Sequence, residues 1–293
     1  MKYSKMKLSA VRHMIMAALA FSVMALCVKK VSGHLPSLEI VFMRSLMGCL
    51  MILAVMFTKK VSVLGKQRGR LILRGINGFL ALALHFYTIS KLPLGTAVLL
   101  NYTAPLFVLL FSLLFLKERS HPAVPFLITL SFFGVYLLIE GGFTAWNMTI
   151  FWGILSAVFA SFAYLTIASL KKRESPLTII FYFTAISTLG AAPSLFMNFV
   201  WPSFTEWLYL WGVGFGSFLG QLWMTIALRR APASLVSPFS YLTPLLSFIY
   251  GLVFFQERIG VTSLLGAGLI IAGGCLLSHY GTLKTPKGKA PQA

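Results

Sequence analysis

The chain has 293 residues, of which 58% are hydrophobic and only 11% are charged. Soluble proteins carry about a quarter charged residues, and a chain of this size leaves much of its surface in contact with its solvent, so the composition excludes an ordinary soluble domain. Twenty-five lysines and arginines against six acidic residues give a formal charge of +19. In a soluble protein this excess would suggest a nucleic-acid partner, so the positions of the charges decide its meaning.

Ten apolar stretches follow one another along the chain, with lengths close to the roughly 20 residues that a membrane-spanning helix needs. Cutting the sequence at charges and at proline, glycine and polar clusters places them at residues 10–28, 38–57, 71–90, 94–116, 122–139, 149–170, 177–200, 207–228, 234–255 and 262–279. The basic N-terminus resembles a signal peptide, but no small-residue cleavage site follows the first stretch, so we expect this stretch to be retained. The sequence therefore predicts an all-α integral membrane protein with ten transmembrane helices.

The basic residues predict how these helices are oriented. With both termini in the cytoplasm, twenty of the twenty-five lysines and arginines fall on the cytoplasmic side and four on the other, while Arg44 alone lies within a span. Such an excess is typical of cytoplasmic loops, and Arg74 is counted among these loop charges. The positive charge thus indicates orientation and attraction to membrane lipid, and we expect no nucleic-acid partner.

The chain also contains an internal repeat. When residues 93–138 are aligned with residues 232–277, twelve of 46 positions are identical without a gap, against roughly one in ten from composition alone. The identical pairs include Pro93 with Pro232, Tyr102 with Tyr241, Pro105 with Pro244, Glu118 with Glu257, and Gly134 with Gly273. Each copy holds five spans. Because five is odd, the second copy crosses the membrane in the opposite direction, as in the inverted repeats of secondary transporters.

The repeated segments resemble a known family. Asn101-Tyr-Thr-Ala-Pro105-Leu, followed by Leu116-Lys-Glu118-Arg119, is echoed by Ser240-Tyr-Leu-Thr-Pro244-Leu, followed by Phe255-Gln-Glu257-Arg258. Both copies resemble the paired EamA domains of the drug/metabolite transporter superfamily, and residues 39–44 are similar to that family's second span. The resemblance covers nearly the whole chain. It implies two inverted five-helix repeats with a substrate cavity between them, lined by spans one, three, four, six, eight and nine.

We accordingly divide the chain into a cytoplasmic N-terminal tail (1–9), a first EamA repeat (10–140), a second, inverted repeat (141–283) and a basic cytoplasmic C-terminal tail (284–293).

No catalytic or metal-binding pattern is present in the sequence. The chain has no aspartate, no HExxH or GxSxG motif and no phosphate-binding loop for ATP. Its histidines lack ligand spacing, and its three cysteines lie singly in apolar stretches. We expect neither an enzyme nor a cofactor, and we expect transport to be gradient-driven or facilitated.

The repeat-matched residues are the first candidates for a substrate site. Tyr102 and Tyr241 are predicted to form aromatic walls, and Asn101, Ser240 and Gln221 to supply orienting hydrogen bonds. Pro105 and Pro244 lie in the middle of their spans at matching positions, where each is either a packing kink or a hinge in a broken helix. Small polar residues in spans four and nine also serve helix packing in membranes, so both interpretations stay open.

Arg44 and His85 are the notable polar residues within the predicted spans, each roughly one to two turns from the outer end of its helix. Arg44 either forms a structural ion pair with Glu39 or Glu140, or binds a carboxylate or phosphate of the substrate. His85 is the titratable candidate for coupling, and Trp223 is an additional wall candidate. In the eighth span, Gly212, Gly216 and Gly220 recur four residues apart, which predicts a helix-packing face.

These patterns predict a secondary transporter in the bacterial inner membrane that moves a small metabolite by alternating access, with oligomeric state left open. No acidic residue lies in the middle of any span, which favours an amino-acid-like or zwitterionic solute over a permanent cation, and we expect an exporter. The alternatives are an importer of a nucleoside-like or sulfonium solute such as S-adenosylmethionine, a channel, and a non-transporting receptor or assembly factor. Short loops argue against the receptor, and the lack of a charged ring or carbonyl filter argues against the channel.

Overall fold

The computed structural model describes residues 2–115, 123–139, 148–170, 173–197, 199–231 and 233–280, and all of its regular structure there is helical. The helices are α1 (Lys2–Val31), α2 (Ser37–Thr58), α3 (Arg68–Lys91), α4 (Leu94–Asn101), α5 (Ala104–Phe115), α6 (Ala123–Leu138), α7 (Met148–Leu170), α8 (Pro176–Ala191), α9 (Ser194–Met197), α10 (Phe204–Arg230), α11 (Ala233–Ser240), α12 (Leu242–Phe255) and α13 (Val261–Tyr280). Helices lie within each of the ten predicted ranges.

Among the described residues, seven helical segments are long and apolar enough to cross a membrane. Two shorter apolar helices, α6 and α13, accompany them, and α10 adds a further helix of 27 residues. Helices suit this solvent because every backbone polar group is satisfied within the segment. The chain is therefore a multi-pass membrane protein.

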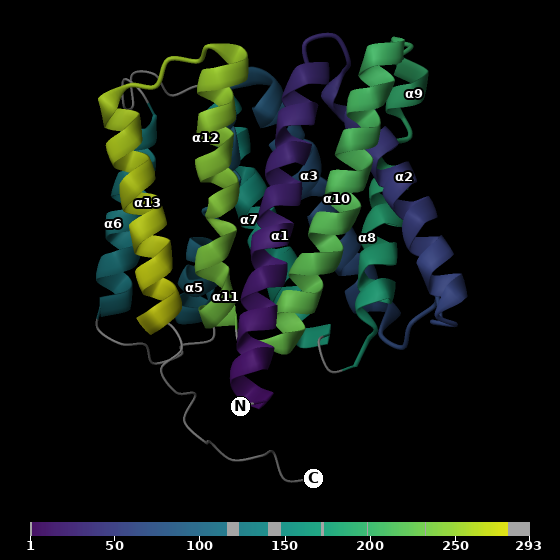
Figure 1. The fold of residues 1–293 in the computed structure, drawn as a ribbon, viewed down its shortest axis with the longest axis horizontal. Helices are drawn as coiled ribbons and strands as arrows, with labels where there is room; N and C mark the ends of the chain where they lie inside the picture. The colour runs from purple at the N-terminus through teal and green to yellow at the C-terminus, as the bar shows by residue number, and fades with distance from the viewer. Residues whose placement is uncertain are drawn as a thin grey trace.

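The long helices stand side by side and alternate in direction along the chain (Figure 1). α1 begins and α13 ends at the same end of the bundle. We call this the basic end, because Lys59, Lys60, Lys66, Arg68 and Arg70 lie there around the connection from α2 to α3. Along this alternation, α7 runs in the direction opposite to α1 (Figure 1).

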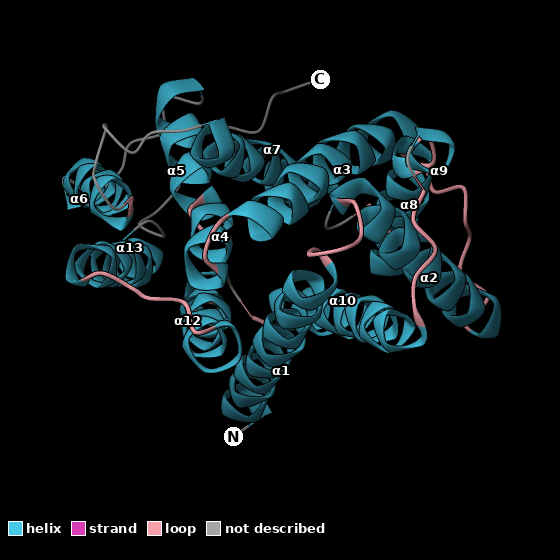
Figure 2. Cartoon of the chain, turned by 90° about the horizontal axis from the view of Figure 1, so that it is seen from above, coloured by secondary structure: helices cyan, strands magenta, loops and turns pink. Residues whose placement is uncertain are grey.

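The two halves of the chain pack against each other reciprocally. α1 packs on α10 and α3 packs on α7, while α2, α4 and α6 pack on α8, α12 and α13. Let α4–α5 and α11–α12 each count as one pass, and leave out the short α9. The first pass of each half then contacts the third pass of the other half, and the second, fourth and fifth passes contact their equivalents. Reciprocal contacts of this kind are what a two-fold relationship produces. Viewed from above, the α6–α13 pair lies at one edge and α2 and α8 at the other (Figure 2).

The symmetry extends to single residues where α6 meets α13. A Cβ at Gly134 would meet Gly266 and Ile270, and a Cβ at Gly273 would meet Leu127 and Ser131. An offset of 139 residues converts one set of contacts into the other, so the repeat found in the sequence is also a repeat in packing. The missing side chains let the two backbones approach closely, as small residues do between helices in lipid.

The glycine row of α10 is a packing face, as predicted. Gly212 lies against Cys27, Gly216 against Ala20 and Met24, and Gly220 against Phe21, all of them on α1. The largest group of buried apolar side chains extends from this contact to α2, α3 and α4, and includes Val28, Ile40, Phe86 and Val98. This packing fixes the helices that carry the polar residues described below.

The close contact between α6 and α13 predicts that adding one methyl group lowers stability at Gly266 but not at Gly268. Gly266→Ala would place a carbon against the backbone of Gly134, Leu137 and Leu138, and backbone cannot yield as a side chain can. We expect a loss of about 1–3 kcal/mol in the free energy of unfolding, measured by SDS titration in mixed micelles. Gly268→Ala is the matched control, since nothing lies within 4 Å of its Cβ. An unchanged stability in Gly266→Ala would contradict this packing.

Candidate functional site

Two helices are broken at the repeat-matched tyrosines. α4 ends at Asn101 and α5 begins at Ala104, so Tyr102 and Thr103 lie in the first break. In the second repeat α11 ends at Ser240 and α12 begins at Leu242, which leaves Tyr241 in the second break. Pro105 and Pro244 fall in the first turns of α5 and α12, where a helix needs no backbone N–H. The two prolines therefore start the second halves of two broken helices.

Local hydrogen bonds satisfy the backbone at the first break. The Thr103 hydroxyl donates to the Leu100 carbonyl at 2.6 Å, and the N–H groups of Leu106 and Phe107 donate to the Thr103 carbonyl. At the second break, the Leu245 N–H donates to the Tyr241 carbonyl. The Thr243 hydroxyl donates across to the Ala18 carbonyl of α1 at 3.2 Å. Irregular backbone can thus persist at membrane depth because protein groups replace water.

Tyr102 and Tyr241 meet between the two repeats. Their ring centroids are 6.4 Å apart, with the ring planes tilted by 55°. Tyr102 is partly exposed, whereas Tyr241 is only 3% exposed and its hydroxyl packs on Gly274 of α13. The structure thus brings the two predicted aromatic residues together. Of the two, only Tyr102 has surface left for a solute.

Two buried arginines converge on one aromatic ring. The guanidinium carbon of Arg44, on α2, lies 5.0 Å from the centroid of the Phe183 ring, and that of Arg74, on α3, lies 4.5 Å from it. Arg44 and Arg74 are 3% and 5% exposed. By the ~1.5 Å rise per residue, each lies roughly 10 Å along its helix, from opposite ends of the bundle. The two guanidinium groups therefore meet in the interior of the helix bundle, at Phe183.

Three of the guanidinium nitrogens of these arginines are buried without a hydrogen-bond partner. Arg44 donates one hydrogen bond, from Nε to the Ser217 hydroxyl at 2.9 Å, and its Nη1 has no partner. Arg74 has no partner at Nε or Nη1. Among the described residues no carboxylate lies within ion-pair distance of either arginine. Two like charges thus share a buried space without an anion.

The chain provides room for the Arg74 guanidinium. Gly78 lies one helical turn after Arg74 on the same face of α3, and a Cβ at this position would collide with Arg74 Nη1 and with the Phe183 ring. Tyr164 of α7 lies within electrostatic reach of Arg74, and also of Tyr102 and Tyr241. Tyr164 is 39% exposed. Tyr164 is therefore a further polar side chain on the helix that packs against α3.

The remaining predicted site residues are more scattered. Asn101 donates from Nδ2 to the Ser156 hydroxyl of α7 at 3.1 Å. His85 is buried on α3, and its Nδ1 has no partner. Ser240 is the last residue of α11, next to Tyr241. Gln221 and Trp223 are half-buried on α10, and no interaction joins them to the tyrosine pair.

The structure corrects two expectations about charge. Arg74, counted as a loop charge, is buried, because its side chain turns toward Phe183 of α8 and away from the basic end. Arg44 does not pair with Glu39, because the Glu39 carboxylate accepts a hydrogen bond from the Val200 N–H at 3.1 Å, beyond the end of α9. Glu140, the other expected partner, lies outside the described residues.

Sequence reasoning missed three members of this site: Arg74, Phe183 and Tyr164. A signal for Arg74 exists in the sequence, since Gly78 follows it at the four-residue spacing that opens space beside a long side chain. Phe183 is one of 26 phenylalanines, so no sequence pattern distinguishes it. In the described part of the chain, no cluster of histidine, cysteine or acidic side chains could hold a metal ion.

An ion pair closes the end of the bundle opposite the basic end. Lys29 of α1 lies 3.4 Å from the Glu257 carboxylate and donates to the Leu92 carbonyl at 2.6 Å. Glu257, from the repeated Glu-Arg motif, also accepts from the Leu94 N–H at 2.7 Å, at the first residue of α4. One carboxylate of the second repeat thereby caps a broken helix of the first. We call this cluster of Lys29, Leu94 and Glu257 the far-end latch.

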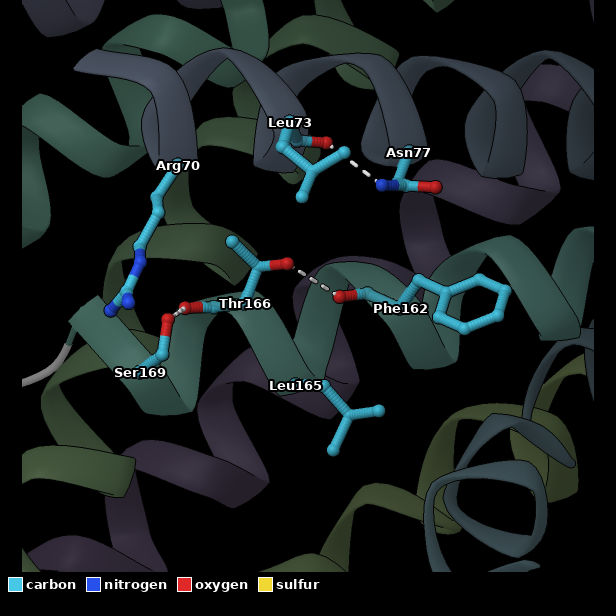
Figure 3. Close-up of a pocket in the computed structure, with 7 residues that line it drawn as sticks. All are labelled: Arg70, Leu73, Asn77, Phe162, Leu165, Thr166 and Ser169. Carbon is cyan, nitrogen blue, oxygen red and sulfur yellow. Dashed lines mark hydrogen bonds between the residues drawn. The ribbon is translucent and has the colours of Figure 1, made fainter. Parts of the chain in front are cut away.

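An open groove of about 470 Å³ lies apart from these residues, between α3 and α7 (Figure 3). It is lined by Arg70, Leu73, Asn77, Phe162, Leu165, Thr166 and Ser169. None of the predicted site residues lines it, so it is a separate feature of the molecule.

Comparison with known proteins identifies the chain's relatives. The EamA-like transporter family matches twice, at residues 8–140 and 147–279. The pseudopaline exporter CntI of Pseudomonas aeruginosa is 35% identical over 92% of this chain and 96% of its own length. The S-adenosylmethionine uptake transporter of Rickettsia felis is 26% identical over 83% of each chain. A solved crystal structure shares the fold, with a TM-score of 0.66 and 22% identity over 94% of this chain and 96% of that one.

The far-end latch predicts graded losses of stability. Glu257→Gln keeps an oxygen to accept from the Leu94 N–H but removes the charge, so we expect a small loss. Glu257→Ala leaves that N–H without its acceptor, and we expect a loss of about 1–3 kcal/mol in the free energy of unfolding. SDS titration of both variants measures the difference, with the exposed neighbour Arg258→Gln as control. Equal losses for the two Glu257 variants would show that capping of α4 contributes nothing.

Proposed function

The chain belongs to the EamA-like transporter family, and we propose that it exports a small amino-acid-like metabolite whose carboxylate binds between Arg44 and Arg74. Its family and its relatives are membrane transporters, and the chain is likewise a membrane transporter and not an enzyme. One observation carries the proposal. The buried guanidinium groups of Arg44 on α2 and Arg74 on α3 lie beside Phe183 without a described acidic partner.

The proposed topology has ten spans in two inverted repeats, residues 10–140 and 141–283, with both termini in the cytoplasm of a bacterial cell. The basic end is then the cytoplasmic end, and the far-end latch closes the outer end. The reciprocal packing of the two halves supports this arrangement, as does the excess of basic residues at the end where α1 begins. The path between the repeats would thus be closed on the outside.

Energetic cost is the first argument for an anionic group on the substrate. An arginine at the centre of a bilayer costs about 2.5–3.5 kcal/mol even on the lowest scales, and removing charges from water is repaid only by good partners. Two such residues side by side also repel each other. Stability alone therefore gives no reason to keep both arginines, whereas recognition of an anion does.

Geometry is the second argument. Guanidinium groups bind carboxylates through two parallel N–H bonds, and Arg74 has unused donors at Nε and Nη1, with another at Nη1 of Arg44. Both groups border one ring, so a single carboxylate can contact both. The partly exposed rings of Tyr164 and Tyr102 offer aromatic faces that suit the apolar or cationic remainder of a zwitterion.

The broken helices supply the moving part. Tyr102 and Tyr241 lie at matching breaks in the two repeats and touch each other, so a small rotation of one repeat against the other changes their contact. Breaks at matching positions of inverted repeats are typical of transporter binding sites. If the site closed toward the cytoplasm and opened toward the exterior, the bound solute would be released outside. The likeness to the pseudopaline exporter supports the outward direction.

Uptake of a sulfonium solute is the alternative, because a relative is an S-adenosylmethionine uptake transporter. The buried arginines disfavour a permanent cation in the same space, since like charges repel strongly at low dielectric constant. S-adenosylmethionine also carries an amino-acid carboxylate, so its additional sulfonium charge is what distinguishes it. Competition separates the two: an amino acid with an uncharged side chain should displace the bound substrate, and S-adenosylmethionine should do so only weakly.

The arginine pair predicts a loss that depends on the substrate's charge. We expect Arg44→Gln and Arg74→Gln each to lower transport of a carboxylate-bearing solute by about tenfold or more, because a charge-assisted hydrogen bond contributes about 1.5–3 kcal/mol. Transport of the corresponding amide should change little. Flux from proteoliposomes, with a panel of amino acids and their amides, measures this. Lys91→Gln, an exposed charge at the end of α3, is the control.

The same variants predict an unusual effect on stability. Removing one of two unpaired charges should leave the melting temperature unchanged or raise it, because the charges repel and are poorly solvated. A decrease of several degrees in both variants, together with equal losses for acid and amide, would show that the arginines are structural and would overturn the proposal.

A further inference from the structure

The groove between α3 and α7 has a polar end and an apolar length. Arg70 lies in the first turn of α3 and Ser169 in the last turn of α7, so both are at the basic end. Arg70 extends from α3 toward Ser169 (Figure 3). Leu73, Leu165 and Phe162 line the groove further along the two helices. A charge at a helix end, followed by an apolar channel parallel to the helices, matches the layout of a phospholipid.

The groove faces outward from the bundle. Leu73 is 51% exposed and Phe162 is 38% exposed, and Arg70 and Ser169 are also exposed. In a multi-pass membrane protein, exposed apolar side chains such as Leu73 and Phe162 are expected to face lipid. The Arg44 and Arg74 side chains, by contrast, are buried, so the groove is separate from the proposed substrate site.

In the part of the chain that the structure describes, no acidic side chain forms an ion pair with Arg70. Among the described residues, ion pairs are formed by Lys29 with Glu257 and by His34 with Glu206. Glu174, the acid closest in sequence to the end of α7, accepts from the backbone N–H groups of Lys66 and Gln67. The guanidinium of Arg70 is therefore available for a phosphate. Lys66, Arg68 and Arg173 at the same end add positive potential.

The other polar groups of the groove offer acceptors. The Thr166 hydroxyl donates to the Phe162 carbonyl and the Ser169 hydroxyl to the Thr166 carbonyl, while Asn77 Nδ2 donates to the Leu73 carbonyl. With these donors used inside their own helices, the oxygens are left to accept hydrogen bonds. A headgroup that combines a phosphate with hydroxyl donors can bind the Arg70 guanidinium through the phosphate and the Thr166 or Ser169 oxygens through its hydroxyls.

We propose that this groove binds one molecule of an anionic phospholipid with a hydroxyl-bearing headgroup, of the phosphatidylglycerol type. The phosphate lies against Arg70, the headgroup hydroxyls donate to Ser169 or Thr166, and an acyl chain follows Leu73, Leu165 and Phe162. The lipid bridges α3 and α7, one of the helix pairs that join the first half of the chain to the second, and so stabilises the contact between the halves.

Native mass spectrometry of the intact protein, titrated with phosphatidylglycerol or phosphatidylcholine in detergent, tests this site. The wild type should prefer phosphatidylglycerol, and Arg70→Gln should lower its affinity about fivefold, as expected for one basic residue near a headgroup. Arg68→Gln is the matched control, because Arg68 is an exposed arginine two residues away that does not line the groove. Its affinity should stay near that of the wild type.

A second variant tests the apolar part of the groove without changing charge. Leu165→Trp fills the channel and should weaken binding of phosphatidylglycerol while Arg70 is retained. Millimolar inorganic phosphate should not displace the lipid. Equal losses in Arg68→Gln and Arg70→Gln would reveal general electrostatic attraction, and displacement by phosphate would reveal a free-anion site. Either outcome, or an unchanged affinity in Arg70→Gln, would overturn the proposal.

Discussion

Lipid offers no hydrogen bonds, and this constraint determines where the chain is regular and where it is interrupted. Most of the described structure is helix because helices satisfy their own backbone. The breaks at Tyr102 and Tyr241 persist because the Thr103 hydroxyl, turn bonds and the Thr243 bond to α1 satisfy the exposed groups. Both breaks lie where the fourth passes of the two repeats meet, which shields them from the bilayer. The same constraint makes Arg44 and Arg74 conspicuous, since nothing described in the protein neutralises them.

The reciprocal packing of the halves suits the proposed rotation of one repeat against the other. Each repeat places its first pass on the third pass of the other, and the fifth passes meet across the closely packed contact of Gly134, Gly266 and Gly273. When the two repeats make equivalent contacts with each other, two relative orientations of the repeats can have similar energies. The far-end latch favours one of them, because Glu257 both pairs with Lys29 and caps α4. A solute that contacts groups from several helices, as one bound at Arg44 and Arg74 would, can shift that balance.

Much of the fold could be predicted from the sequence because apolar length and repeated Pro and Glu-Arg motifs are local signals. The glycine face of α10 was predictable in the same way, from its spacing. The helix breaks were harder, since the sequence places Pro105 and Pro244 but not whether the helix bends or stops. Arg74 was misassigned because six basic residues fall within residues 59–74 and together look like one loop. Only tertiary structure shows that the last of them turns inward to Phe183. The prediction of Glu39, one of the two expected partners of Arg44, was likewise wrong, because Glu39 accepts a hydrogen bond from the Val200 backbone, a contact made across 161 residues of sequence.

The central claim is that one carboxylate-binding site is exposed alternately to the two sides of the membrane. Exchange in proteoliposomes tests this most directly. Vesicles are loaded with an unlabelled amino-acid solute, and the entry of the labelled solute is followed. The account predicts that the internal solute accelerates entry and produces a transient accumulation above equilibrium, and that its amide does neither. Entry that is independent of the internal solute, or equally accelerated by acid and amide, would contradict a carrier that recognises its substrate through Arg44 and Arg74.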